Sequence, residues 1–163
     1  MDNTFDHDVF MDKAIELFRR NGILNVSLEE IAKQANISTD VVHKEYSSVT
    51  ALVSRIAERE NAAIAQIHIE CLDSPGRPDA RLARLVKEVM IRLAKGYVLE
   101  LFNTAGRISN PEEHAFMMNN LPPNILDYRR QNTAAIARII AQGQADGTFS
   151  QFDPMEGAFL LRG

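Results

Sequence analysis

The sequence is poor in several features that mark whole classes of protein. Cys71 is its only cysteine, which excludes an intrachain disulfide and a zinc site built from several cysteines. No apolar run approaches the ~20 residues that a membrane-spanning helix requires. The N-terminus has no basic segment followed by an apolar one, so we expect no signal peptide. Together these absences predict a cytoplasmic protein without a membrane partner.

An excess of positive charge is also missing. The 163 residues carry 18 Lys and Arg against 22 Asp and Glu, a formal net charge of -4. The whole acidic excess lies in residues 1–60, which hold seven basic and eleven acidic side chains. Because nucleic-acid-binding proteins usually present a basic surface, the total charge gives no support for such a partner.

Signatures of catalysis are absent as well. The histidines are scattered along the chain, as His7, His43, His68 and His114. None has a second His four residues away or a Cys beside it, which argues against a zinc site. There is no nucleophile elbow, phosphate-binding loop or dinucleotide glycine pattern. We therefore expect no enzymatic activity, no metal and no cofactor.

Helical periodicity, in contrast, runs through almost the whole chain. Apolar residues recur three and four positions apart, and no convincing strand alternation occurs. The predicted helices cover about 8–20, 28–35, 38–45, 49–72, 79–102, 111–121, 125–145 and 154–163. The fold class is therefore all-α.

Capping residues mark several helix boundaries. Ser27 and Glu30 have the spacing of a capping box, and Asn36 suits a turn because it tolerates positive φ. Ser38 is expected to cap the third helix. Asp153 followed by proline announces a last helix, of which only residues 155–163 are present. We expect this C-terminal helix to be truncated.

The three short helices between residues 8 and 45 have the layout of a helix-turn-helix unit. In such a unit one helix supports, the second crosses the DNA backbone and the third enters the major groove. A generic three-helix core would show the same periodicity. Pattern alone therefore leaves both readings open.

Specific residues add to this pattern over residues 8–53. The distinctive stretches are Ala14-Ile15-Glu16-Leu17-Phe18 with Asn21-Gly22, Val26-Ser27-Leu28-Glu29-Glu30-Ile31-Ala32, Ala35-Asn36-Ile37-Ser38, and Ala51-Leu52. In order and spacing they resemble the TetR/AcrR family of ligand-responsive repressors. The resemblance implies a helix-turn-helix DNA-binding domain over residues 1–50 and a helical ligand-binding and dimerisation domain over residues 51–163. It also implies a homodimer whose binding to operator DNA is controlled by a small-molecule effector.

The candidate DNA contacts lie in and around the second and third helices. They are Ser27, Lys33, Ser38, Thr39, Asp40, His43, Lys44 and Tyr46. The chain departs from the usual family pattern here: His43 replaces a phosphate-contacting Tyr, and Val49 replaces a phosphate-anchoring Lys. Asp40 and Glu45 add carboxylates near the face that would meet DNA. The alternative hypothesis is a degenerate relative that no longer binds DNA and acts through protein–protein contact.

Candidate effector contacts are implied for the second domain. They are Met90, Tyr97, Phe102, Arg107, His114, Phe116, Met117, Met118 and Tyr128. Methionines suit an adaptable apolar site, so the expected effector is a small apolar or amphipathic molecule. Aromatic and Met side chains at helical spacing are also typical of an ordinary core.

Overall fold

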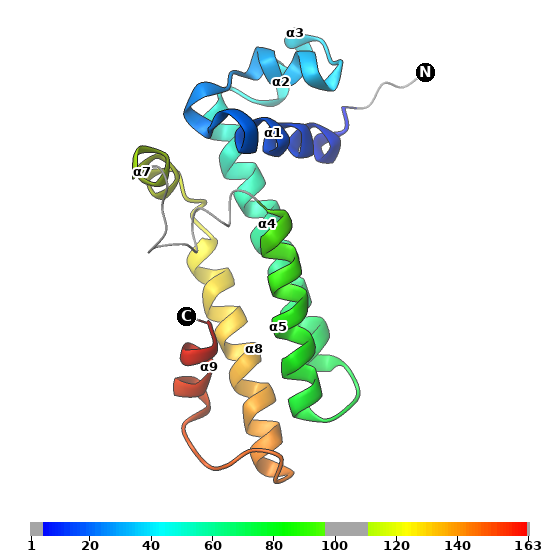
Figure 1. The fold of residues 1–163 in the computed structure, drawn as a ribbon, viewed down its shortest axis with the longest axis vertical. Coiled ribbons are helices and arrows are strands. Elements are labelled where there is room, and N and C mark those ends of the chain that lie inside the picture. Colours follow the sequence, from blue (N-terminus) through cyan, green and yellow to red (C-terminus); the bar gives the residue numbers. More distant parts are fainter. Residues whose placement is uncertain (1–4, 97–110, 163) are drawn as a thin grey trace. The chain divides into compact units, whose positions relative to one another are not determined.

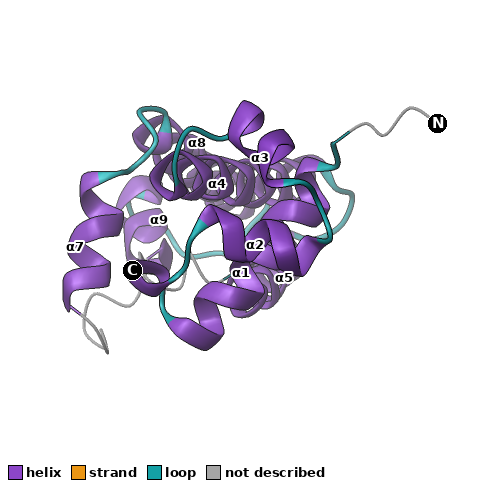
Figure 2. Ribbon diagram, turned by 90° about the horizontal axis from the view of Figure 1, so that it is seen from above, coloured by secondary structure: helices purple, strands orange, loops and turns teal. Residues whose placement is uncertain are grey.

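A computed structural model describes residues 5–96 and 111–162, and every regular element in this part is helical (Figure 2). The predicted all-α class is therefore confirmed. In chain order the elements are α1 (His7–Asn21), the 3₁₀ turn η1 (Ile23–Asn25), α2 (Leu28–Ala35), α3 (Thr39–Glu45), α4 (Val49–Asp73), α5 (Pro78–Lys95), α7 (Pro111–Asn119), α8 (Ile125–Ala145) and α9 (Pro154–Arg162) (Figure 1).

The chain divides into two compact units. Unit 1 comprises Met1–Glu58 and Gly96–Pro122, and unit 2 comprises Arg59–Lys95 and Pro123–Gly163. This division differs from the single boundary near residue 50 that the sequence suggests. Helix α4 continues from one unit into the other, and α7 belongs with the N-terminal helices.

Most predicted helix caps are present. The Ser27 hydroxyl accepts from the Glu30 N–H at 3.2 Å, and the Glu30 carboxylate accepts from the Ser27 N–H at 3.0 Å. Asp153 caps α9 by accepting from the Met155 N–H at 2.7 Å. The predicted cap by Ser38 is wrong: Ser38 precedes α3, but its side chain makes no capping hydrogen bond. Its carbonyl instead accepts the first helical N–H groups of α3.

Unit 1 has one continuous apolar core. Its fully buried members include Phe10 and Phe18 of α1, Ile31 of α2, Val42 of α3 and, from α7, Met117. Helix α1 contributes side chains at the three- and four-residue spacing read from the sequence, whereas α3 and α7 contribute one buried apolar side chain each. The core therefore fixes α3 against α1 and α2 and brings α7 to the same group.

Unit 2 is built from the second half of α4 with α5, α8 and α9. Its core includes Cys71 of α4, Leu85 of α5, Ile136 and Ile139 of α8, and Ala158 of α9. Cys71 is fully buried and serves as a small apolar residue of this core. Burial also raises the pKa of its thiol, so the thiol stays protonated and inert.

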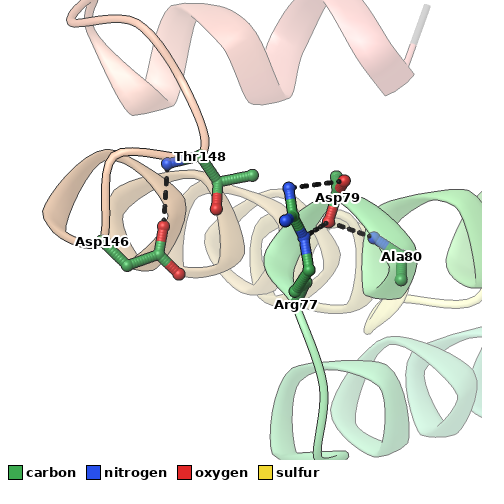
Figure 3. A network of polar contacts seen from close by, with 5 residues as sticks. All are labelled: Arg77, Asp79, Ala80, Asp146 and Thr148. Carbon is green, nitrogen blue, oxygen red and sulfur yellow. Dashed lines mark hydrogen bonds and ion pairs between the residues drawn. The ribbon is translucent and has the colours of Figure 1, made fainter.

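Short polar contacts close one end of unit 2. The Arg77 guanidinium pairs with Asp79 just after α5 begins, and Asp146 at the end of α8 accepts from the Thr148 N–H at 2.9 Å (Figure 3). The hydrogen bond from Arg77 lowers the pKa of Asp79. These exposed contacts order the α4–α5 turn and the α8–α9 turn at one end of the bundle.

Candidate nucleic-acid interface and the α7 contact

A tight turn sets the direction of α3 relative to α2. Asn36 ends α2 in the left-handed conformation, with φ 55° and ψ 43°. The Ile37 N–H then donates to the Ala32 carbonyl at 2.9 Å, which satisfies an otherwise unpaired helix-end group. Val42 anchors α3 because it is fully buried. This is the compact geometry of a helix-turn-helix unit.

The outer face of α3 is polar and open. Asp40, His43 and Lys44 are exposed, and Val41 is 37% exposed. Lys44 has no hydrogen-bond or ion-pair partner among the residues that the structure describes. This face offers one cation, one imidazole and one carboxylate to a partner.

Glu29 of α2 contacts the imidazole of His43 on this face. Its Oε1 lies 2.9 Å from His43 Nε2. The pKa of Glu29 is lowered, first by a hydrogen bond from backbone N–H at the start of α2 and second by the His43 contact. The ionised carboxylate therefore competes with any phosphate for His43.

The structure places Tyr46 in the core, which corrects its assignment as a DNA contact. Tyr46 is 3% exposed and its ring stacks on Phe10, with ring centroids 5.5 Å apart. Its hydroxyl lies 3.0 Å from His7 Nδ1. Because aromatic stacking and this hydrogen bond hold the ring inside, Tyr46 does not belong to the DNA-contacting set.

The remaining candidates have mixed positions. Lys33 and Ser38 are exposed, whereas Ser27 and Thr39 are half-buried. The oxygen of Ser27 is already used in the capping box, although its hydroxyl proton is still available as a donor. The α2–turn–α3 segment that carries the open face of α3 also contains Lys33, Ser38 and Thr39.

A contact that sequence reasoning missed joins α7 to η1. Glu113 is 5% exposed, and its Oε1 accepts from the Ile23 N–H at 2.8 Å. Gly22 precedes this contact with φ 82°, and a Cβ built on it would lie 2.5 Å from the same Oε1. Position 22 thus requires glycine for its φ and for the close approach of Glu113. In the sequence, Glu113 stands out only as an acidic residue in the first turn of a helix, where the helix dipole favours it.

The predicted effector residues that the structure describes belong to both units. Tyr97, Phe102 and Arg107 lie outside the described residues. Met117 is fully buried in the core of unit 1, with Phe116 packed against that core. In the same unit His114 is half-buried and Met118 is 46% exposed, while in unit 2 Met90 is 60% exposed and Tyr128 is half-buried.

A hollow in unit 2 was not predicted from the sequence. It measures about 520 Å³ and opens to the surface. Its walls come from α5, α8, the α8–α9 connection and α9, namely Leu82, Ile140, Phe149, Phe152, Glu156, Gly157, Leu160 and Leu161. Of the predicted effector residues within 5–96 and 111–162, none lines it.

Metal-binding clusters and membrane-spanning helices are both absent from the described residues. Within residues 5–96 and 111–162, no group of three His, Cys, Asp or Glu side chains is placed to hold a metal ion. None of the helices in these ranges is long and apolar enough to cross a membrane.

Comparison with known proteins identifies relatives of this architecture. Residues 10–56 match the family model described as bacterial regulatory proteins, tetR family. The TetR family regulator PfmR of Thermus thermophilus superposes with a TM-score of 0.73, at 14% identity, over 93% of this chain and 79% of that chain. A TetR/AcrR family regulator of Thermobifida fusca gives 0.69, at 20% identity, over 95% and 79%.

A third similar structure contains ligands. AibR, in complex with isovaleryl coenzyme A and operator DNA, gives a TM-score of 0.65 at 16% identity, over 95% of this chain and 80% of that chain. At these identities the structural likeness concerns the fold. None of the curated proteins compared by sequence matches this chain.

Proposed function

From the TetR-family match of residues 10–56 and the TetR/AcrR fold of the described chain, we propose that this protein is a DNA-binding transcriptional regulator controlled by a small-molecule effector. It acts as a repressor, and as a homodimer it places two α3 helices in successive major grooves of operator DNA. Effector binding favours a conformation in which the two helices no longer match that spacing.

The open face of α3 is the observation that carries this proposal. The α2–turn–α3 geometry supports α3 from behind through Val42 and leaves His43 and Lys44 outward. Lys44 pairs with phosphate, and His43 donates a hydrogen bond once it leaves Glu29. Asp40 accepts from the amino group of cytosine, which is a base-specific contact.

The contact between Glu113 and η1 supplies a route for control. It ties α7 to the turn just before α2, although the two bonded residues are 90 positions apart in sequence. A conformational change that moves α7 must break or carry along this buried hydrogen bond. An effector is coupled to the helix-turn-helix unit if it biases whether this contact is made or broken.

Selection from a random duplex pool tests the proposal. The purified chain is incubated with random-sequence DNA at low salt, and the bound duplexes are sequenced. The proposal predicts enrichment of a palindromic motif with half-sites about one helical turn apart. A pool that stays random, together with no retention of DNA, would contradict it.

The acidic character of the interface favours a second candidate function. Glu29 and Asp40 lie on or beside the open face, and residues 1–60 carry all of the net negative charge. A degenerate regulator that binds a basic protein surface would use the same face. It predicts no DNA retention in the selection above, and binding to basic protein partners that Asp40→Asn weakens.

A further inference from the structure

At one end of unit 2, helices α4, α5 and α8 meet at the same level. Gly143 of α8 approaches Pro78 of α5, whose Cβ would be 3.0 Å from a Cβ at position 143. Arg81 donates to the Leu72 carbonyl of α4 at 2.8 Å and to Gln142 of α8 at 2.6 Å. The start of α5 therefore lies level with the ends of α4 and α8, and α5 runs antiparallel to both (Figure 1).

Beyond this end the contact stripes of α5 and α8 are apolar, and α4 adds the buried Cys71 and His68. Cys71 of α4, Leu85 of α5 and Ile136 with Ile139 of α8 form one buried cluster. On α5 and α8 these residues continue the spacing that begins at Pro78 and Gly143, so these two stripes face each other. A bundle of this kind is expected to remain apolar along its axis.

Each of the three helices carries a polar side chain at one level. Asn61 of α4 lies eleven residues before Leu72, Arg92 of α5 eleven after Arg81, and Asn132 of α8 ten before Gln142. At 1.5 Å per residue each lies about 15–17 Å from the closed end. Asn61 and Asn132 are each 8% exposed and Arg92 is half-buried. We call Asn61, Arg92 and Asn132 the polar layer.

Two atoms of the polar layer lack a partner. Arg92 Nε and Asn132 Oδ1 are fully buried, and neither makes a hydrogen bond to any residue in the described part of the chain. A buried polar group without a partner costs about 1–3 kcal/mol, and more when it is charged. Two such groups on helices that pack against each other call for a partner, which ordered water or a ligand can supply.

We propose that the polar layer binds the anionic head group of the effector, and that the effector is an organic carboxylate. The Arg92 Nε–H donates to a carboxylate oxygen, a charge-assisted hydrogen bond that a neutral group does not match. The Asn132 side-chain amide presents its acceptor oxygen to this site. Rotation of the amide by half a turn puts its donor NH2 group in the same place.

This inference rests on the proposed effector control and adds the chemical class of the effector. The competing explanation is a purely structural layer in which Arg92 and Asn132 are hydrated. The two differ in one respect: a carboxylate site discriminates between an acid and its matched amide, because the amide lacks the negative charge.

Calorimetric titration of the full chain tests the inference without DNA. The probes are octanoate and benzoate, each against its neutral amide, with octylamine as a cationic control. We expect at least one carboxylate to bind about tenfold or more tightly than its amide, a difference of about 1.4 kcal/mol. Equal affinity within both pairs, including no binding of either member, would overturn the inference.

Variants test whether Arg92 causes the preference for a carboxylate over its amide. Arg92→Gln is expected to remove it and Arg92→Lys to retain part of it. Lys87→Gln, an exposed change of the same charge on α5, is expected to leave it intact. Discrimination that survives Arg92→Gln would overturn the inference. If Arg92→Gln fails to fold, Asn132→Asp is used in its place. The added carboxylate is expected to weaken octanoate binding and to leave octanamide binding unchanged. An unchanged ratio of the two affinities would again overturn the inference.

The same proteins are titrated with labelled duplex DNA to separate the two proposals. DNA binding without carboxylate discrimination would contradict the polar layer alone. Carboxylate discrimination at Arg92 without DNA binding would contradict the regulator and leave the ligand site standing.

Discussion

The carboxylate of Glu113 accepts a hydrogen bond from the backbone N–H of Ile23 at 2.8 Å, across 90 positions of sequence. Glu113 is 5% exposed and Ile23 is 1% exposed, so the Ile23 N–H is shielded from water and depends on this acceptor. Hydrogen bonds to charged groups stabilise more than neutral ones. The contact therefore ties the position of α7 to the turn that precedes the helix-turn-helix unit.

Replacing Glu113 by Ala is expected to lower the free energy of unfolding by about 1–3 kcal/mol, because the buried Ile23 N–H loses its acceptor. Chemical denaturation followed by circular dichroism measures the change. The matched control is Glu112→Ala, which removes the same charge from an exposed neighbouring position and is expected to change stability by about 0.5 kcal/mol or less. Equal effects of the two variants would contradict the account.

Substitution of Gly22 by Ala separates backbone strain from the close approach of Glu113. Gly22 and Gly147 have similar φ values, 82° and 79°, but nothing lies within 4 Å of a Cβ at position 147. Gly22→Ala is expected to destabilise by about 1 kcal/mol or more beyond Gly147→Ala, since it adds a clash to the same strain. Thermal unfolding of both variants decides this, and a larger loss in Gly147→Ala would argue against the clash.

Neutralising Glu29 is expected to strengthen DNA binding. The ionised Glu29 holds His43 at 2.9 Å and repels phosphate, and its lowered pKa keeps it charged at neutral pH. Glu29→Gln is expected to raise affinity for duplex DNA several-fold at low salt, measured by fluorescence anisotropy. Asp127→Asn, an equal charge change on α8, is the control; an equal gain in both would show a general charge effect and no role for the His43 pair.

Stability is expected to fall as the pH drops below about 6.5, the ordinary pKa of histidine. His68 is 5% exposed, its Nδ1 lies 2.8 Å from the Ile64 carbonyl, and burial lowers its pKa. Between its lowered folded pKa and its ordinary value the unfolded chain binds more protons. Unfolding free energy therefore rises with pH in this window, by at most about 1.4 kcal/mol per pH unit for one proton.

Denaturation curves at pH 5, 6 and 7 measure this dependence. His68→Gln removes the titrating group and is expected to flatten the curve in that window. His114→Gln, at a half-buried position in α7, serves as the control and is expected to leave the difference between pH 7 and pH 5 unchanged. An equally steep curve in His68→Gln would assign the dependence to other groups.

Local chemistry made much of the fold predictable. The Ser27–Glu30 capping box, the left-handed Asn36 and the Asp153 cap all depend on residues within four positions of each other, and each is present. Ser38 shows the limit of this reasoning: a good capping residue before a helix does not have to use its side chain. Here its carbonyl alone begins the helix.

Contacts between residues far apart in the sequence determine the features that the sequence did not predict. Tyr46 follows the third helix like a DNA-contacting residue, but Phe10 and His7 draw it into the core. Met117 was assigned to an effector site because methionine suits such sites, and it lies in the core of unit 1. Helical periodicity shows which face is buried and does not show which helix covers it.

The DNA affinity of this acidic helix-turn-helix unit tests the central claim most directly. Fluorescence anisotropy of a labelled duplex carrying the selected motif is measured at several salt concentrations with the native chain, Lys44→Gln and Lys87→Gln. The account predicts binding that weakens linearly on a log–log salt plot, a slope reduced by about 0.9 in Lys44→Gln, and no change in Lys87→Gln. Absence of binding at low salt, or binding that Lys44→Gln leaves unchanged, would contradict it.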